Sequence, residues 1–177
     1  NALKRIEIAE NVTPNRIQLD SSRGGIAFEM NVSRWVEYVV KVPRWANVSL
    51  KNTNGEVIAS GITGSVRLET TNGEIKASAI EGALHAESTN GDMVLEVLKL
   101  SDDGVECSTT NGEIVLTVPS AAKASIDVQT NNGDIETGGL DLVVKDKGRK
   151  DLRATLGGGG ARIKLETTNG DITLRGK

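Results

Sequence analysis

Aromatic residues are scarce in this chain of 177 residues, and so are cysteine and proline. Phe, Tyr and Trp make up only 2% of the sequence, and all of them lie between residues 28 and 45. A core without aromatic side chains must be filled by small aliphatic ones, which suits a thin, regularly layered architecture. The single cysteine, Cys107, excludes an intrachain disulfide framework.

Long apolar runs and an excess of positive charge are also missing. No stretch approaches the roughly 20 apolar residues that a membrane-spanning helix needs. The net charge is −3, and residues of both signs are interspersed along the chain. We therefore expect neither a membrane span within this chain nor a nucleic-acid partner.

Glycine is abundant, with 20 residues, and part of it belongs to an internal repeat. The dipeptide Asn-Gly recurs with successive spacings of 18, 18, 21, 21 and 37 residues. Its flanks match as well, as in VRLETTNGEI from Val66 and IKLETTNGDI from Ile163. We call each such unit a row. The six turn motifs are Asn54-Gly55, Asn72-Gly73, Asn90-Gly91, Asn111-Gly112, Asn132-Gly133 and Asn169-Gly170.

Apolar and polar residues alternate within each row. In the row from Val66, Val66 and Leu68 are apolar and Arg67 between them is charged. An acidic residue follows every Asn-Gly, and an aliphatic residue then returns. This period of two predicts one strand on each side of the Asn-Gly, each with one buried face.

Two all-β architectures fit a strand, an Asn-Gly and a second strand. Asn-Gly between alternating runs is the strongest local hairpin signal, and it predicts an antiparallel β-sandwich or meander. Alternatively, the Asn-Gly turns a corner in a single-chain β-solenoid (β-helix), whose short coils stack as parallel strands about 4.8 Å apart. The identity of aligned residues favours the solenoid, because stacking needs the same residue at the same position. The aligned Thr and Asn positions indicate side-chain ladders.

Both ends depart from the repeat. We interpret residues 1–47 as N-terminal strands and a cap, continuous with a repeat solenoid over residues 48–177, so that the chain is a single domain. Residues 17–26 are read as a degenerate row and the aromatic segment 28–45 as the cap of the first coil. The long gap before Asn169 is read as a row that lacks the motif plus a surface excursion over Lys145–Arg153. The final row is expected to end with an uncovered edge.

The repeated Thr-(Thr/Asn)-Asn-Gly-acid-aliphatic unit resembles the bacterial adhesin-like repeat domain, a domain of unknown function. That domain is related to the head domain of adhesin-like autotransporters. Val42-Pro43 before the first repeat and LGGGGARIKLETTNGDITL from Leu156 match it too, so the resemblance covers about residues 17–176. It implies an extracytoplasmic β-helical protein, some of whose relatives belong to envelope-stress systems, and it brings no catalytic residues.

The acidic residue after each Asn-Gly is the first candidate for a site. Stacked rows would align these carboxylates as a ladder, and such oxygen-rich positions suit calcium. The Gly-Gly-x-Gly-x-Asp calcium repeat is absent, however, and Lys76 can offset the charge. We therefore expect no metal and no cofactor, and we interpret the ladder as a solubilising edge. Its members are Glu56, Glu74, Asp92, Glu113 and Asp134.

The remaining candidates are single side chains and one aromatic cluster. His85 stands at an outward position and Cys107 at an inward one, so they do not form a catalytic pair. Trp35, Tyr38 and Trp45 could bind a sugar or a peptide, although packing of the cap is the preferred interpretation. No catalytic residue is predicted.

We expect a non-catalytic, adhesin-like scaffold or binding module that is extracytoplasmic: at the cell surface, in the periplasm or secreted. Its partner would be a surface protein, a glycan or another copy of itself. One alternative is a structural subunit that assembles head to tail into filaments through the uncovered last row. The other is a polysaccharide-processing β-helix enzyme.

Overall fold

The computed structural model describes the backbone of residues 6–13, 16–23 and 37–177, and side chains within the last of these ranges. The chain divides into two compact units, Asn1–Val40 and Lys41–Lys177, and each is described by itself. The described part is all β and contains no helix. Half of the predicted aromatic cap, residues 28–36 with Trp35, lies outside the described residues.

The first unit contains one pair of antiparallel strands. β1 (Ile6–Thr13) pairs with β2 (Arg16–Arg23) along its whole length. The prediction of a degenerate row at residues 17–26 is wrong over the described part, because β2 pairs in the antiparallel sense. The physical reason is that Arg23 stands where a row has Asn, so this segment lacks the residue pair that turns a strand into a second sheet.

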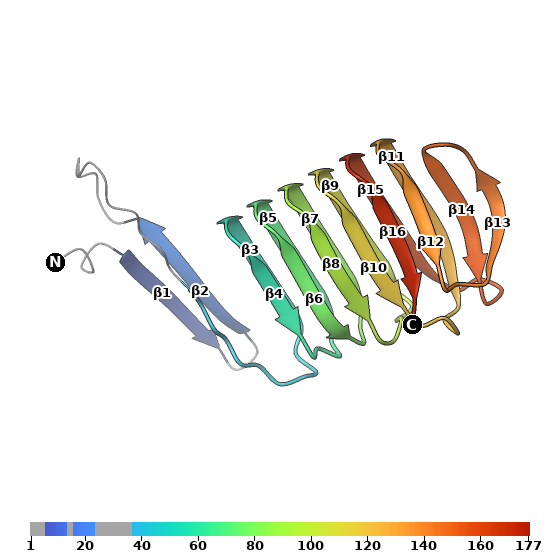
Figure 1. Cartoon of the computed structure of the whole chain (residues 1–177). Coiled ribbons are helices and arrows are strands. Elements are labelled where there is room, and N and C mark those ends of the chain that lie inside the picture. Colours follow the sequence, from blue (N-terminus) through green and yellow to red (C-terminus); the bar gives the residue numbers. More distant parts are fainter. Residues whose placement is uncertain (1–5, 14–15, 24–36) are drawn as a thin grey trace. The chain divides into compact units, whose positions relative to one another are not determined.

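The second unit consists of two mostly parallel sheets (Figure 1). The larger sheet has eight strands in the order β13-β14-β11-β15-β9-β7-β5-β3, and the smaller has six in the order β12-β16-β10-β8-β6-β4. The strands of the larger sheet are β3 (Val48–Asn54), β5 (Val66–Asn72), β7 (Leu84–Asn90), β9 (Val105–Asn111), β11 (Ala124–Asn132), β13 (Leu142–Lys147), β14 (Asp151–Leu156) and β15 (Ala161–Asn169). Those of the smaller sheet are β4 (Val57–Ser60), β6 (Ile75–Ile80), β8 (Met93–Val97), β10 (Ile114–Val118), β12 (Ile135–Gly138) and β16 (Ile172–Gly176).

Each row contributes one strand to each sheet, and the Asn-Gly lies at the corner between them. Neighbouring rows pair in parallel and in register, so that Val66 lies opposite Val48 on one side and Leu84 on the other. The two strands that flank an Asn-Gly do not pair with one another: β3 pairs with β5, and β4 with β6. The predicted parallel stacking is confirmed, and the alternative of antiparallel Asn-Gly hairpins is wrong.

The core lies between the two sheets and is aliphatic apart from Met93 and Cys107. The predicted inward positions are buried: Leu68 and Leu165 are fully inaccessible in the larger sheet, and Ile75 and Ile114 in the smaller. Burying one such side chain stabilises the fold by about 1.5–3 kcal/mol. The repeated inward positions therefore act as one continuous core along the stack.

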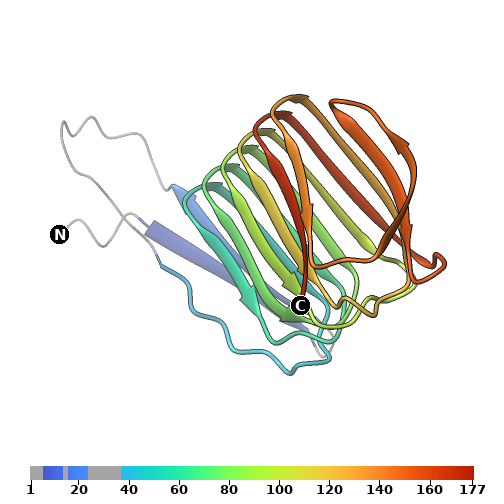
Figure 2. The same ribbon diagram turned by 45° about the vertical axis from the view of Figure 1, so that its right-hand side comes forward.

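The order of rows in space differs from their order in the sequence. The last row inserts between two earlier ones: β15 pairs with β9 and β11, and β16 pairs with β10 and β12. Figures 1 and 2 show these red strands inside the stack rather than at its end. The predicted uncovered edge of the final row is therefore wrong. One physical reason is charge, because the insertion places Lys164 between Glu106 and Asp127.

The segment between the last two Asn-Gly motifs forms an antiparallel hairpin. β13 pairs with β14, and β14 pairs with β11, so both extend the larger sheet. The prediction of a motif-free row plus a surface excursion over Lys145–Arg153 is wrong. The cause is the alternation of Leu152, Ala154 and Leu156, which buries one face of β14 against the end of the core.

Candidate functional site

The outer face of the larger sheet carries two lines of polar side chains. Because the strands pair in register about 4.8 Å apart, outward residues of neighbouring rows are close enough to interact across the strands. The first line, in spatial order, is Ser49, Arg67, His85, Glu106, Lys164, Asp127 and Arg153. The second line, two residues away from the first on each strand, is Lys51, Glu69, Glu87, Ser108, Glu166, Gln129 and Asp151. We call these two lines together the charged face.

Ion pairs join the charged face from β3 to β7. Glu69 accepts from both neighbours: Lys51 Nζ lies 2.9 Å from its Oε2, and Arg67 Nε lies 2.5 Å from its Oε1. The hydrogen bond from Lys51, followed by that from Arg67, lowers the pKa of Glu69. Arg67 also reaches Glu87 on the next strand at 3.5 Å. Arg67 is thus shared between carboxylates of adjacent rows, and Lys51 links its row to the next through Glu69.

The chain of charges continues to β15 and β11. Lys164 Nζ lies 2.8 Å from Glu166 and 3.5 Å from Glu106. The hydrogen bond to Glu166, and to a smaller extent that to Glu106, raises the pKa of Lys164. Arg162 Nη2 lies 3.8 Å from Asp127. Opposite charges therefore alternate along the face across the row insertion.

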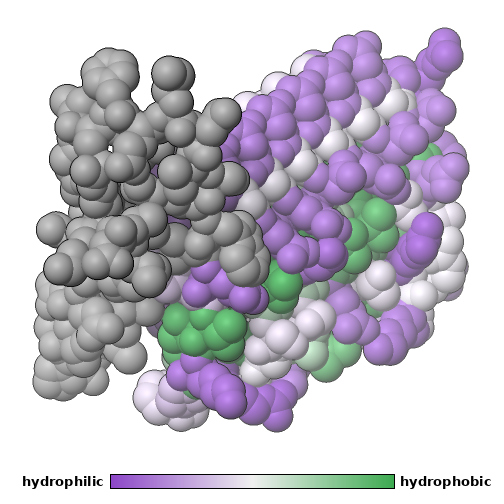
Figure 3. Space-filling model, turned by 60° about the vertical axis from the view of Figure 1, so that its left-hand side comes forward, coloured by the Kyte–Doolittle hydropathy of each residue, from purple (hydrophilic) through white to green (hydrophobic). Residues whose placement is uncertain are grey.

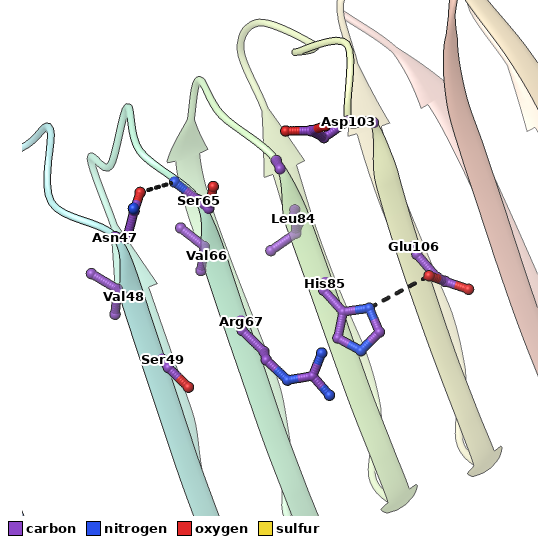
Figure 4. A pocket seen from close by; sticks show the side chains of 12 residues that line it. Asn47, Val48, Ser49, Ser65, Val66, Arg67, Leu84, His85, Asp103 and Glu106 are labelled. Carbon is purple, nitrogen blue, oxygen red and sulfur yellow. Dashed lines mark hydrogen bonds and ion pairs between the residues drawn. The ribbon is translucent and has the colours of Figure 1, made fainter.

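A shallow depression of about 450 Å³ lies on this face, where β3, β5, β7 and β9 begin. Figure 4 shows Arg67, His85 and Glu106 along it, with the apolar Val66 and Leu84 toward the sheet. Arg67 and Glu106 are already held in the ion pairs described above. The charged groups of the depression are thus paired with neighbouring side chains of the sheet, and they do not point together at a place where a ligand could bind.

His85 occupies the middle of the charged face. Its Nε2 lies 3.1 Å from Glu87 and its Nδ1 lies 3.6 Å from Glu106. Nε2 is buried, and the geometry to Glu87 does not qualify as a hydrogen bond. A metal ion on either ring nitrogen would meet only one of the two carboxylates, because they lie at opposite nitrogens. Within residues 37–177, no hydroxyl or thiol hydrogen-bonds to this imidazole.

Cys107 is buried, as its inward position predicts. Burial raises the pKa of its thiol, since a thiolate would lose its hydration there. The thiol faces the core while His85 lies on the charged face, so the two side chains are on opposite sides of the sheet. The pair cannot act as nucleophile and base.

The acidic positions after the Asn-Gly motifs stack in a different order from the predicted one, because Asp171 lies between Glu113 and Asp134. Two of their carboxylates bond to the backbone of the neighbouring row: Asp92 accepts from the Glu113 N–H at 2.8 Å, and Asp171 accepts from the Asp134 N–H at 2.8 Å. Lys76 bonds to two more, Glu56 at 2.5 Å and Glu74 at 2.9 Å. These two hydrogen bonds raise the pKa of Lys76 to about 12.

Metal ligands do not gather along that ladder or elsewhere in the described part, where no group of three His, Cys, Asp or Glu side chains could hold an ion. Carboxylate oxygens of Asp92 and Asp171 are used by backbone N–H groups, and those of Glu56 and Glu74 by Lys76. The prediction of no metal stays a prediction, and the contacts give the acidic residues a structural role at the corners.

The asparagines of the turn motifs form a side-chain ladder on the same edge. Each Asn except Asn54, which only accepts, donates from Nδ2 to Oδ1 of the neighbouring row at 2.8–2.9 Å. The ladder follows the spatial order, so Asn169 donates to Asn111 and accepts from Asn132. The protein is therefore a stack of equivalent rows, which share aligned amides, paired charges and one continuous core.

The family comparison agrees with that description. The chain matches the domain of unknown function described as Toastrack DUF4097 over residues 5–175. It belongs to the Toastrack family. No curated protein and no solved structure matches this Toastrack chain. The described residues contain no helix that could cross a membrane.

The predicted aromatic patch of the Toastrack chain is only partly described. Trp35 lies outside the described residues, and Tyr38 belongs to the first unit. Trp45 is 76% exposed and lies in a turn that Arg44 fixes by bonding Glu81 at 3.0 Å and the Gly61 carbonyl at 3.3 Å. A shared binding patch of the three residues stays a prediction.

Sequence reasoning on the Toastrack chain missed the charged face. The signal was present in the residue between the two inward positions of each row, whose charge alternates from Glu106 through Lys164 to Asp127 once the rows are placed in their true order. Elsewhere the surface is mixed: Figure 3 shows hydrophilic side chains with separate hydrophobic patches between them. Ile58 and Val94 are exposed on the smaller sheet, and Lys76 separates them in the register.

Proposed function

We propose that this Toastrack chain is a β-solenoid that serves as a non-catalytic, adhesin-like scaffold or binding module of the bacterial cell envelope. The charged face carries the proposal. Its side chains are held in ion pairs across five neighbouring strands, from Lys51 on β3 to Glu166 on β15. A flat face of evenly spaced, fixed charges suits a protein or glycan partner that makes many individually weak contacts.

We propose a non-catalytic role because the polar groups of the depression are paired with neighbouring charges. An active site concentrates groups of perturbed pKa around a place where a substrate can sit. Here Arg67, His85 and Glu106 line the depression on the charged face, and each of them lies next to an oppositely charged group of that face instead of a free centre. The depression also lacks a hydroxyl or thiol hydrogen-bonded to the imidazole.

The extracytoplasmic location is part of the same proposal. The resemblance to adhesin-like repeat domains supports it, and the buried Cys107 suits an oxidising compartment because a buried thiol does not pair with another protein. Cell fractionation and protease treatment of intact cells test it. A chain found only in the cytosol would contradict it.

Binding can be tested with purified peptidoglycan and a glycan array as probes. We expect weak binding by the single chain and much stronger binding when it is displayed in many copies. Replacing charges of the charged face with Arg67→Gln and Lys164→Gln should weaken it. Lys76→Gln is the matched control, because Lys76 is also ion-paired but lies on the smaller sheet.

The same experiment separates the proposal from the polysaccharide-processing alternative. Shortening of any glycan, lost in the Arg67 and Lys164 variant, would establish an enzyme and end the scaffold proposal. Binding that is equally strong in that variant and in the control would remove the charged face from the proposal.

The alternative of head-to-tail filaments was based on an uncovered final row, and the described structure does not contain such an edge. The final row is internal, and at the far end β13 and β14 extend the larger sheet beyond the smaller one. A second copy that continued both sheets would have to displace this hairpin. The described structure therefore favours the scaffold over the filament.

A further inference from the structure

Strand β13 forms an open edge of the larger sheet. Within the described residues it pairs only with β14, so one side of its backbone is available for another strand. It is also unusually apolar for an edge, since Val143 is 64% exposed and Val144 is 49% exposed. Exposed apolar edge strands are sites at which a further strand adds to a sheet.

The opposite layer does not cover this edge. The smaller sheet ends at β12, so β14 and β13 continue the larger sheet alone. Val144 lies opposite Ala154, which is buried, yet Val144 itself is half-exposed. Part of the inward face of β13 is thus left without a partner layer.

The sequence of β13 and its flank is complementary to itself in the antiparallel sense. Pairing two copies about Val143 places Val143 opposite Val143 and Leu142 opposite Val144. It also places Asp141 opposite Lys145 at both ends of the paired segment. Apolar pairs and opposite charges directly across from each other are the combination that stabilises neighbouring strands. Neither Asp141 nor Lys145 has an ion-pair partner within residues 37–177.

We propose that two copies of this chain associate through β13, in antiparallel pairing about a two-fold axis at Val143. The contact joins the two larger sheets edge to edge and covers the exposed valines. It is isologous, so it closes at a dimer and does not propagate. Its partner is therefore a second copy of this chain, beyond the surface ligand proposed above.

Local geometry restricts the register of this pairing. The β13 ladder is irregular between Val144 and Asp146, and a bulge of this kind ends regular pairing. The regular segment available to a second copy is therefore Leu142–Val144, and Asp141 and the bulge residue Lys145 flank it. A shift of the register by one residue toward the bulge would bring Asp141 next to Asp146, which sets like charges against each other. The register about Val143 avoids this.

Sedimentation velocity of the full chain over a range of concentrations tests the proposal. We expect dimers at high concentration that dissociate on dilution. Lys145→Asp should raise the dissociation constant by at least about tenfold, because both cross-strand pairs become repulsive. Adding Asp141→Lys to that variant restores the opposite charges, and it should return the dissociation constant to near its original value.

Lys147→Asp is the control, because Lys147 lies beyond the bulge and has no charged partner in this register. It should leave the dissociation constant unchanged, and circular dichroism should show that all variants keep the fold. A chain that is monomeric at every concentration would overturn the proposal. Dimers that survive Lys145→Asp, or masses that grow past the dimer, would overturn it equally.

Discussion

At the scale of single residues, the direction of a side chain matters more than its place in the sequence. Leu68 is completely buried between the sheets, and its neighbour Arg67 is half-exposed on the charged face. The alternation of apolar and polar residues is sufficient to predict this difference, because a strand points successive side chains to opposite sides. The predicted inward and outward positions were therefore the most reliable part of the sequence analysis.

Substitution by Asp at these two neighbours should have unequal effects. Leu68→Asp buries an unpaired carboxylate, so we expect a loss of about 3–5 kcal/mol in the free energy of unfolding. Arg67→Asp removes exposed ion pairs, so the loss should be about 1 kcal/mol or less. Unfolding in urea, followed by circular dichroism, measures both. Equal losses would show that the inward and outward faces are misassigned.

The charged face should make stability depend on pH below neutrality. The hydrogen bond from Lys51, and then that from Arg67, lowers the pKa of Glu69 from its usual value of 4.5. The ionised form is thus favoured in the folded state, so the stabilisation is present above pH 4.5 and is lost as the pH falls through the lowered folded value. Lys51→Ala should raise the pKa of Glu69 in an NMR titration. Lys147→Ala, a lysine outside the charged face, should leave that pKa where it is.

At the scale of elements, the corners control how closely rows can stack. A Cβ placed on Gly112 would lie 2.2 Å from the carbonyl oxygen of Gly91 in the neighbouring row. Such a contact is between two backbones, so no side-chain rotation can relieve it. Asn-Gly is needed here because the glycine permits the approach and the asparagine side chain bonds to the next row.

Two alanine substitutions should separate this effect from the general cost of losing a glycine. Gly112→Ala forces adjacent rows apart, and we expect a loss of about 3 kcal/mol or more in the free energy of unfolding. Gly138→Ala, at the end of β12, meets nothing within 4 Å and should change stability by about 0.5 kcal/mol or less. Thermal and urea unfolding would compare them. A similar loss in both variants would rule out corner contact as the reason for the repeated glycine.

The direction of strand pairing was predicted wrongly for elements that lack Asn-Gly. Alternation in β14, as in Leu152 and Ala154, is the same for a parallel and an antiparallel strand, so it cannot give the direction of pairing. β2 has the same ambiguity. In the six rows, the corner fixes the direction, because the chain that leaves it enters the other sheet. Without a corner, the chain reverses within one sheet instead.

At the scale of the whole molecule, the order of the rows was hidden because their cores are interchangeable. Cys107, Leu165 and Val128 occupy equivalent buried positions, and all three are apolar, so the apolar pattern alone does not give the order of their rows. The charges of the outward residues distinguish the possible orders of the rows. Stacking in sequence order would put Glu106 beside Asp127, whereas the observed order puts Lys164 between them.

Removing the last row should therefore do more than shorten the stack. A chain that ends at Gly160 loses β15 and β16 from the interior, so β9 and β11 no longer have their shared neighbour. We expect its cooperative unfolding transition to disappear in calorimetry and circular dichroism. A shortened chain that still unfolds in one sharp transition would show that β11 can move next to β9 and that the position of the final row is not essential.

The internal position of the last row also bears on how the protein is made. The ribosome synthesises the segment that fills the middle of the stack after everything that surrounds it. Rows that have already emerged can pair with one another, but β11 cannot reach its neighbour β15 until residues 161–169 have been synthesised. Synthesis of this late segment thus becomes a checkpoint for folding, and any product terminated before it keeps an unfilled slot between β9 and β11.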